Sequence, residues 1–67
     1  MPQVAKVATV TGSSPESFAK AADAAVQEAE RRVKGITGGE VVSMHVAVSD
    51  GKITEYRATV RVSYSRS

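Results

Sequence analysis

Two runs of residues that meet at Asp50–Gly51 constrain this chain more than any other feature of its sequence. In the second run, residues 53–65, apolar and polar residues alternate, which is typical of a half-buried strand. Its apolar face is formed by Tyr56, Ala58, Val60, Val62 and Tyr64. The first run, residues 40–48, is also rich in β-branched residues, and Asp-Gly is a preferred pair for a type I′ turn. The sequence therefore predicts a long β-hairpin.

The alternation in residues 40–48 assigns the side chains of this run to two faces. One face is predicted to carry Val42, Met44, Val46 and Val48. The other is predicted to carry Val41, Ser43, His45 and Ala47. The second set would lie beside the polar face of the 53–65 strand, so we expect a mixed polar and apolar surface there.

A strand and a helix are predicted upstream of the hairpin. Residues 4–11 are mostly β-branched and read as a strand. Two helix starts are compatible with the sequence: Ser13 as cap with Glu16 in a capping box, or Ser14 as cap with Pro15 at the first helical position. An apolar stripe then recurs at steps of three and four residues up to Gly35, which predicts a helix of about 20 residues.

These elements define a single α+β domain over residues 1–67, in the order β-α-β-β. We expect a three-stranded antiparallel sheet wrapped around one long helix. One helix covers one sheet face only, so the other face, with Arg57 and Arg61, stays open to partners.

The core that such a chain can build is small. The apolar fraction is 42%, but the chain has one Phe, two Tyr, no Trp and no Cys. Small side chains bury little area, and a small core without disulfides usually needs assembly to be stable. We therefore expect a homo-oligomer.

Charge and hydropathy argue against nucleic-acid and membrane partners. The net charge is only +2, and Arg31, Arg32 and Lys34 cluster where the helix dipole favours cations. No apolar run approaches the roughly 20 residues of a membrane span, and the N-terminus lacks the apolar segment of a signal peptide. A cytoplasmic location is expected.

Catalytic and metal-binding patterns are weak in this sequence. His45 is the only histidine, and no nucleophile or carboxylate is spaced to work with it, so no enzyme is predicted. Gly38 and Gly39 precede a strand and lack the pattern of a phosphate loop. The weak candidates for oxygen ligands to calcium are Glu40, Asp50 and Glu55, which have no EF-hand spacing.

The assembled pattern resembles the dodecin family over nearly the whole chain. The resemblance rests on "KVATVTGSSPESFAKAADAAVQEA", on the Glu40–Val41 pair and on "GKITEYRATVRVSY". It implies a hollow sphere of twelve identical subunits, with helices outside and sheets inside, that binds flavins such as riboflavin and FMN without catalysing a reaction. Some members also bind coenzyme A.

Three positions that match the family's flavin site are altered in this chain. Gly38 stands where the family has a Trp that stacks on the flavin ring, and Arg57 stands where it has a Gln that hydrogen-bonds the ring. His45 replaces an Arg that is frequent in bacterial members. The resemblance therefore implies a small-ligand-binding homododecamer with changed ligand contacts. Its alternatives are a shell that binds calcium or an anionic ligand like coenzyme A, and a purely structural shell.

Overall fold

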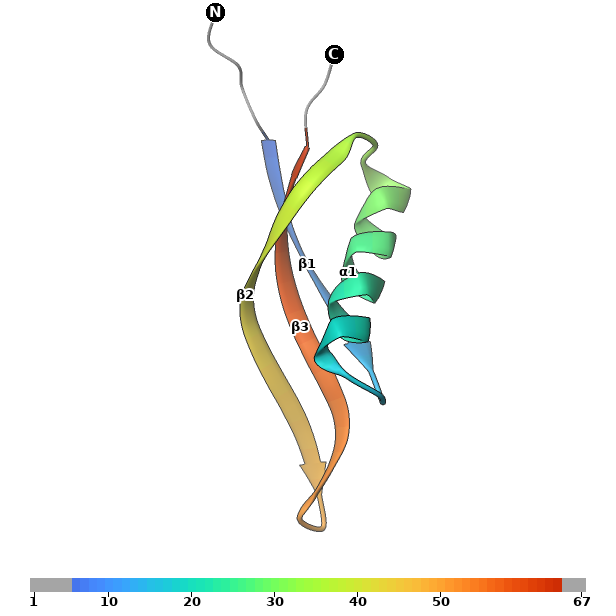
Figure 1. Ribbon diagram of the computed structural model, residues 1–67, viewed down its shortest axis with the longest axis vertical. Helices are drawn as coiled ribbons and strands as arrows, with labels where there is room; N and C mark the ends of the chain where they lie inside the picture. The colour runs from blue at the N-terminus through green and yellow to red at the C-terminus, as the bar shows by residue number, and fades with distance from the viewer. Residues whose placement is uncertain (1–5, 65–67) are drawn as a thin grey trace, which may run out of the picture.

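The computed structural model describes residues 6–64, which form one helix and three strands. β1 spans Lys6–Ser14, α1 Phe18–Arg32, β2 Ile36–Ser49 and β3 Lys52–Tyr64. The sheet has the order β1-β3-β2 with antiparallel neighbours, and α1 packs on one of its faces (Figure 1). The predicted α+β architecture, β-α-β-β, is confirmed.

The helix begins later than either predicted start. β1 continues through Ser14, and the helix is capped by Ser17, whose Oγ accepts a hydrogen bond from the Lys20 N–H at 3.1 Å. Ser13 and Ser14 belong to the sheet, where they pair with β3. Both predicted caps are thus wrong, because Ser13 and Ser14 are paired with β3 as strand residues. As a result, α1 has 15 residues instead of the predicted length of about 20.

The hairpin turn has the predicted geometry. Asp50 and Gly51 both have positive φ, 54° and 74°, as a type I′ turn requires. β2 begins at Ile36, four residues before the predicted position, and α1 ends before Gly35, which has a φ of 85°. The predicted strand ends at residues 4–5 and at Ser65 lie outside the described residues.

The core is a thin layer of small side chains between α1 and the central strand β3. The buried residues are Ala21, Ala25, Ala29, Ala58, Val60 and Val62. Val62 is the largest side chain that is fully buried, so each residue contributes little apolar area. The apolar face predicted for β3 is therefore confirmed. The core consists of small side chains, as the composition predicted.

A close contact between α1 and β1 depends on Gly12. A Cβ at this position would lie 2.3 Å from the carbonyl oxygen of Ala21 and 2.5 Å from the backbone nitrogen of Ala25. These atoms are helix backbone and cannot move aside individually. The helix therefore lies directly on β1, and it also packs on β3 while touching β2 little.

A β-bulge in β2 changes one of the predicted faces. Val41 pairs with Val60 but Ser43 pairs with Thr59, so Val42 is the extra residue. An extra residue reverses the alternation on one side of it. Val41 therefore lies on the helix side of the sheet, like Met44, and its predicted place on the open face is wrong.

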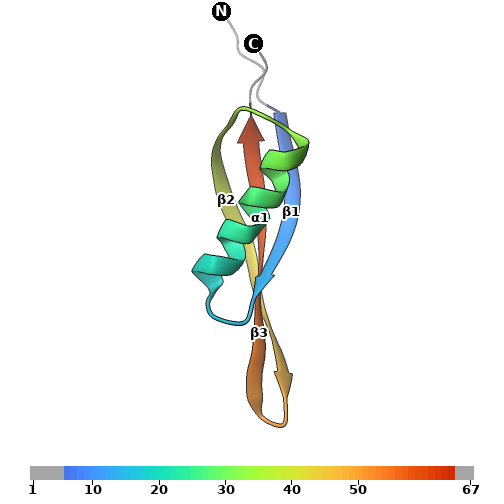
Figure 2. The ribbon, with the colours of Figure 1, turned by 90° about the vertical axis from the view of Figure 1, so that its right-hand side faces the viewer.

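The hairpin formed by β2 and β3 extends beyond the helix. Figures 1 and 2 show that its distal half, which ends at the turn, has no helix packed against it. On the helix side this part carries Met44 and Val48, which are 62% and 59% exposed. Within residues 6–64, no helix is long and apolar enough to cross a membrane.

Candidate functional site

The sheet surface that points away from α1 is the candidate site, and we call it the open face. It follows from the core, because the residues that alternate with buried Ala58, Val60 and Val62 must point the other way. On β3 these are Glu55, Arg57, Thr59, Arg61 and Ser63. Their cross-strand partners are Ala47, His45, Ser43, Glu40 and Gly38 on β2, and Ser13, Thr11, Thr9 and Val7 on β1.

Two ion pairs hold the arginines of the open face. Arg61 Nη2 donates to Glu40 Oε1 at 2.6 Å across the β2–β3 pair, and Arg57 Nε donates to Glu55 Oε1 at 2.9 Å within β3. All four side chains are roughly one-third to two-thirds exposed, so each pair contributes little to stability. Their main effect is to fix the positions of the guanidinium groups.

His45 and Arg57 are direct cross-strand neighbours on the open face. Opposed Cβ atoms in an antiparallel pair are about 4.5–5.5 Å apart, so one ligand can contact both side chains. Both groups donate hydrogen bonds, and a guanidinium has no acceptor. The sequence marked both positions, and the structure brings them together.

Gly38 leaves an open notch at the other end of this face. A Cβ at Gly38 would meet only the Ser63 Oγ, at 3.7 Å, which is an ordinary contact. The Ser63 hydroxyl donates to the Gly38 carbonyl at 3.4 Å, and Val7 lies across β3 in the same row, 58% exposed. The notch thus has room for a larger side chain or a flat ligand, and an exposed apolar side chain lies two strands away in the same row.

Hydroxyl groups lie between the notch and the His45–Arg57 pair. Thr11 Oγ1 and Thr59 Oγ1 are 3.0 Å apart across β1 and β3, and Ser43 lies opposite Thr59 on β2. Hydroxyls both donate and accept, so this row offers hydrogen bonds of either sense to a ligand on the sheet.

The three carboxylates that were weak calcium candidates are not brought together. Glu40 is bound by Arg61, Glu55 is bound by Arg57, and Asp50 lies at the hairpin turn. Among residues 6–64 there is no group of three or more His, Cys, Asp or Glu side chains that is placed to hold a metal ion.

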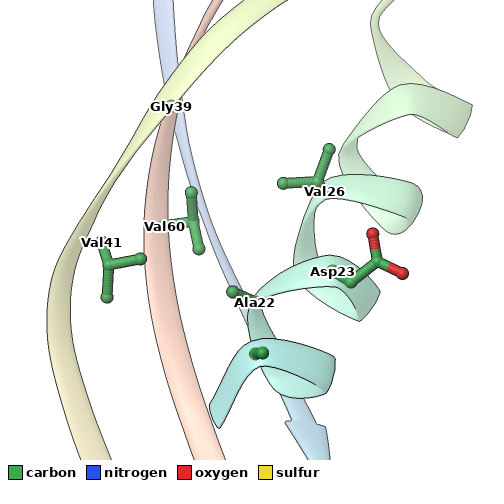
Figure 3. A pocket seen from close by; sticks show the side chains of 7 residues that line it. Ala22, Asp23, Val26, Gly39, Val41 and Val60 are labelled. Atoms are coloured by element: carbon green, nitrogen blue, oxygen red, sulfur yellow. The ribbon is translucent and has the colours of Figure 1, made fainter.

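A second hollow lies on the opposite side of the sheet, between α1 and β2. This α1–β2 groove has a volume of about 320 Å³ (Figure 3). It is lined by Ala19, Ala22, Asp23, Val26, Gly39, Val41 and Val60. The sequence analysis missed it because the bulge at Val42 places Val41 and Gly39 on this side. The adjacent valines at 41 and 42, which interrupt the alternation, are the one signal that indicated a bulge.

The fold and the open face define a small α+β protein that presents an uncovered polar sheet surface as its candidate ligand site. The sequence profile of the dodecin family matches residues 4–66, and the chain belongs to this family. A comparison with curated protein sequences gives no match.

Solved structures of dodecins share the fold. The dodecin from Streptomyces davaonensis is 22% identical, with a TM-score of 0.91 over 100% of this chain and 98% of that one. The dodecin from Streptomyces coelicolor is 20% identical, with a TM-score of 0.89 over 97% and 93% of the two chains. A mutant of the T. thermophilus dodecin is 21% identical, with a TM-score of 0.89 over 98% of each.

Proposed function

We propose that this chain is the subunit of a non-enzymatic, hollow homododecamer that binds a small ligand on its open face. The observation that carries the proposal is the notch at Gly38, on the same uncovered face as His45 and Arg57. A ligand with a flat ring in the notch and a polar or charged end near His45 and Arg57 would contact both parts of the open face. The ligand class is flavin or a related ring system.

Self-association is supported by what the single chain leaves unburied. Among residues 6–64, no buried side chain is larger than valine, and the chain has no cysteine to form a disulfide. Several large apolar side chains are about half exposed: Val7, Val41, Val42, Met44, Val48 and Ile53. A small domain of this kind gains stability when copies cover such groups. The cytoplasmic location stays a prediction.

The altered contacts change the expected ligand preference. Gly38 offers no ring to stack on, which removes about 1–3 kcal/mol per stacked ring. Arg57 donates hydrogen bonds without accepting any, and His45 lies directly opposite. This pair favours a ligand with an anionic end, such as FMN or a coenzyme A-like molecule, over neutral riboflavin.

The experiment that tests the proposal is a titration of riboflavin and FMN with Gly38→Trp, followed by flavin fluorescence. We expect Gly38→Trp to raise the affinity by about 5- to 150-fold, because it restores one stacking contact worth about 1–3 kcal/mol. Gly38→Ala is the matched control. It fills the notch without a ring and should leave the affinity within about twofold, or about 0.4 kcal/mol.

The same titration separates the alternatives. Tighter binding of FMN than of riboflavin by the unchanged protein supports an anionic ligand at His45 and Arg57. An equal gain from Gly38→Trp and Gly38→Ala contradicts the stacking argument. Absence of flavin binding by all three proteins would reject the flavin class and favour a shell for another ligand or for none.

A further inference from the structure

Among residues 6–64, the open face carries no Phe, Tyr or Trp ring. The chain has one Phe and two Tyr, which are Phe18, Tyr56 and Tyr64. Phe18 lies in α1 and contacts Tyr56, with ring centroids 5.0 Å apart and an interplanar angle of 76°. Tyr56 and Tyr64 alternate in step with buried Val62, so both point to the helix side of the sheet. A flat ligand on the open face therefore has no such ring of the same subunit to stack on.

The open face does carry planar polar side chains, and one of them borders the notch at Gly38. The planar groups are those of His45, Arg57 and Arg61. His45 and Arg57 oppose each other nearer to the hairpin turn. Arg61 lies two residues from Ser63, the cross-strand partner of Gly38. Side chains two residues apart on one strand face are separated by about 7 Å, so Arg61 stands in the row next to the notch.

Glu40 fixes the guanidinium of Arg61 in this row. Arg61 Nη2 donates to Glu40 Oε1 at 2.6 Å, and this bond draws the guanidinium toward β2, the strand that carries Gly38. The hydrogen bond uses one edge of the guanidinium, whereas a ring stacks on its flat faces. Both side chains of the pair are about half exposed or more, so a ligand on the sheet can reach them.

We propose that Arg61 supplies the stacking surface that Gly38 lacks: its guanidinium packs on the flat ring of a ligand bound in the notch, and Glu40 holds it in place. Guanidinium groups stack on aromatic rings, and the positive charge is attracted to the face of the ring. A Cβ at Gly38 would meet only the Ser63 Oγ, at 3.7 Å, so a ring can approach the sheet beside Arg61. The inference rests on the proposed function and adds a ligand contact to it.

This contact recognises the ring of the ligand and not its anionic end. Glu40 already balances the charge of Arg61, which leaves the flat guanidinium as the main contribution of Arg61 to binding. Riboflavin and FMN share the same ring system and differ in the phosphate. Arg61 should therefore contribute equally to the binding of both.

Arg61→Lys tests the stacking, because it keeps the positive charge and replaces the flat guanidinium by a compact ammonium group. Titrations of riboflavin and of FMN, followed by flavin fluorescence, measure the two affinities. We expect both to fall by about 2- to 30-fold, and by the same factor. The matched control is Arg31→Lys, the same exchange in an exposed ion pair of α1 with Glu28. It should leave both affinities within about twofold.

Glu40→Ala tests the positioning role of Glu40 and keeps Arg61. Without its partner the guanidinium must be ordered when the ligand binds, so both affinities should fall by about 2- to 10-fold. Circular dichroism checks that each variant keeps the fold, and Glu40→Ala carries the test if Arg61→Lys does not fold. A higher affinity of Glu40→Ala for riboflavin would overturn the positioning role.

The outcomes separate this inference from the proposed function. Equal losses for riboflavin and FMN in Arg61→Lys support the stacking contact. A loss confined to FMN would mean that Arg61 binds the phosphate, which overturns the inference. Unchanged affinities in Arg61→Lys overturn it as well and leave flavin binding in place. Absence of flavin binding by the unchanged protein overturns both the inference and the flavin class of the proposed function.

Discussion

Gly12 and Gly38 lie on opposite faces of the sheet, and each lacks a side chain for a different reason. At Gly12 the missing Cβ is replaced by the helix backbone, 2.3 Å from where the atom would be. At Gly38 the nearest heavy atom to the missing Cβ is a serine hydroxyl at 3.7 Å, and space remains beyond it. The first glycine permits the fold, and the second leaves room for a ligand. The helix-side face of this sheet is therefore constrained by packing at Gly12, and the open face has no such constraint at Gly38.

The largest effect that would test this comparison is the loss of stability in Gly12→Ala. A Cβ there must push the helix off β1, so we expect the free energy of unfolding to fall by about 3 kcal/mol. Gly38→Ala, as the control, should change it by less than about 0.5 kcal/mol. Denaturant titration at a fixed protein concentration measures both, and a stable Gly12→Ala protein would show that the helix is not held close to β1.

The next effect concerns the central strand. Val62→Ala removes methyl groups from the largest fully buried side chain and should destabilise the chain by about 2 kcal/mol. Thr59→Ala, on the open face of the same strand, is the comparison and should cost less than half as much. Equal losses from the two variants, measured by thermal unfolding, would mean that both faces of β3 are covered to the same degree.

A smaller effect is expected at the helix cap. Ser17→Ala removes the acceptor for the Lys20 N–H and should cost about 1 kcal/mol. Ser13→Ala changes a residue that the sequence offered as a cap but that lies in β1. A larger melting-temperature decrease for Ser13→Ala than for Ser17→Ala would place the helix start where the sequence first suggested it.

The smallest effect is expected on the open face. A double-mutant cycle of Glu40→Gln and Arg61→Gln should give a coupling energy of about 0.2–1 kcal/mol, because both side chains are exposed. The coupling should weaken in high salt, since mobile ions screen exposed charges. A salt-independent coupling well above this range would indicate that the pair becomes buried when the protein assembles.

The sequence allowed much of this site to be predicted, and the misses have physical causes. His45 and Arg57 were placed on one face from the sequence and do lie there, because strand alternation is a local property. Gly38 was identified through the family resemblance, and it lies on the same face only because the bulge at Val42 reverses the alternation. The helix start was wrong because Ser13 and Ser14 have equally good local uses as caps and as strand residues. Only pairing with β3 decides between these uses.

The sequence by itself determined the order of elements, the turn at Asp50–Gly51 and the apolar face of β3. Each depends on neighbouring residues and their preferred backbone angles. The tertiary structure decided the close approach of α1 to Gly12, the bulge at Val42 and the groove between α1 and β2. These features depend on how one element packs on another, and contacts between distant segments leave no periodic trace in the chain.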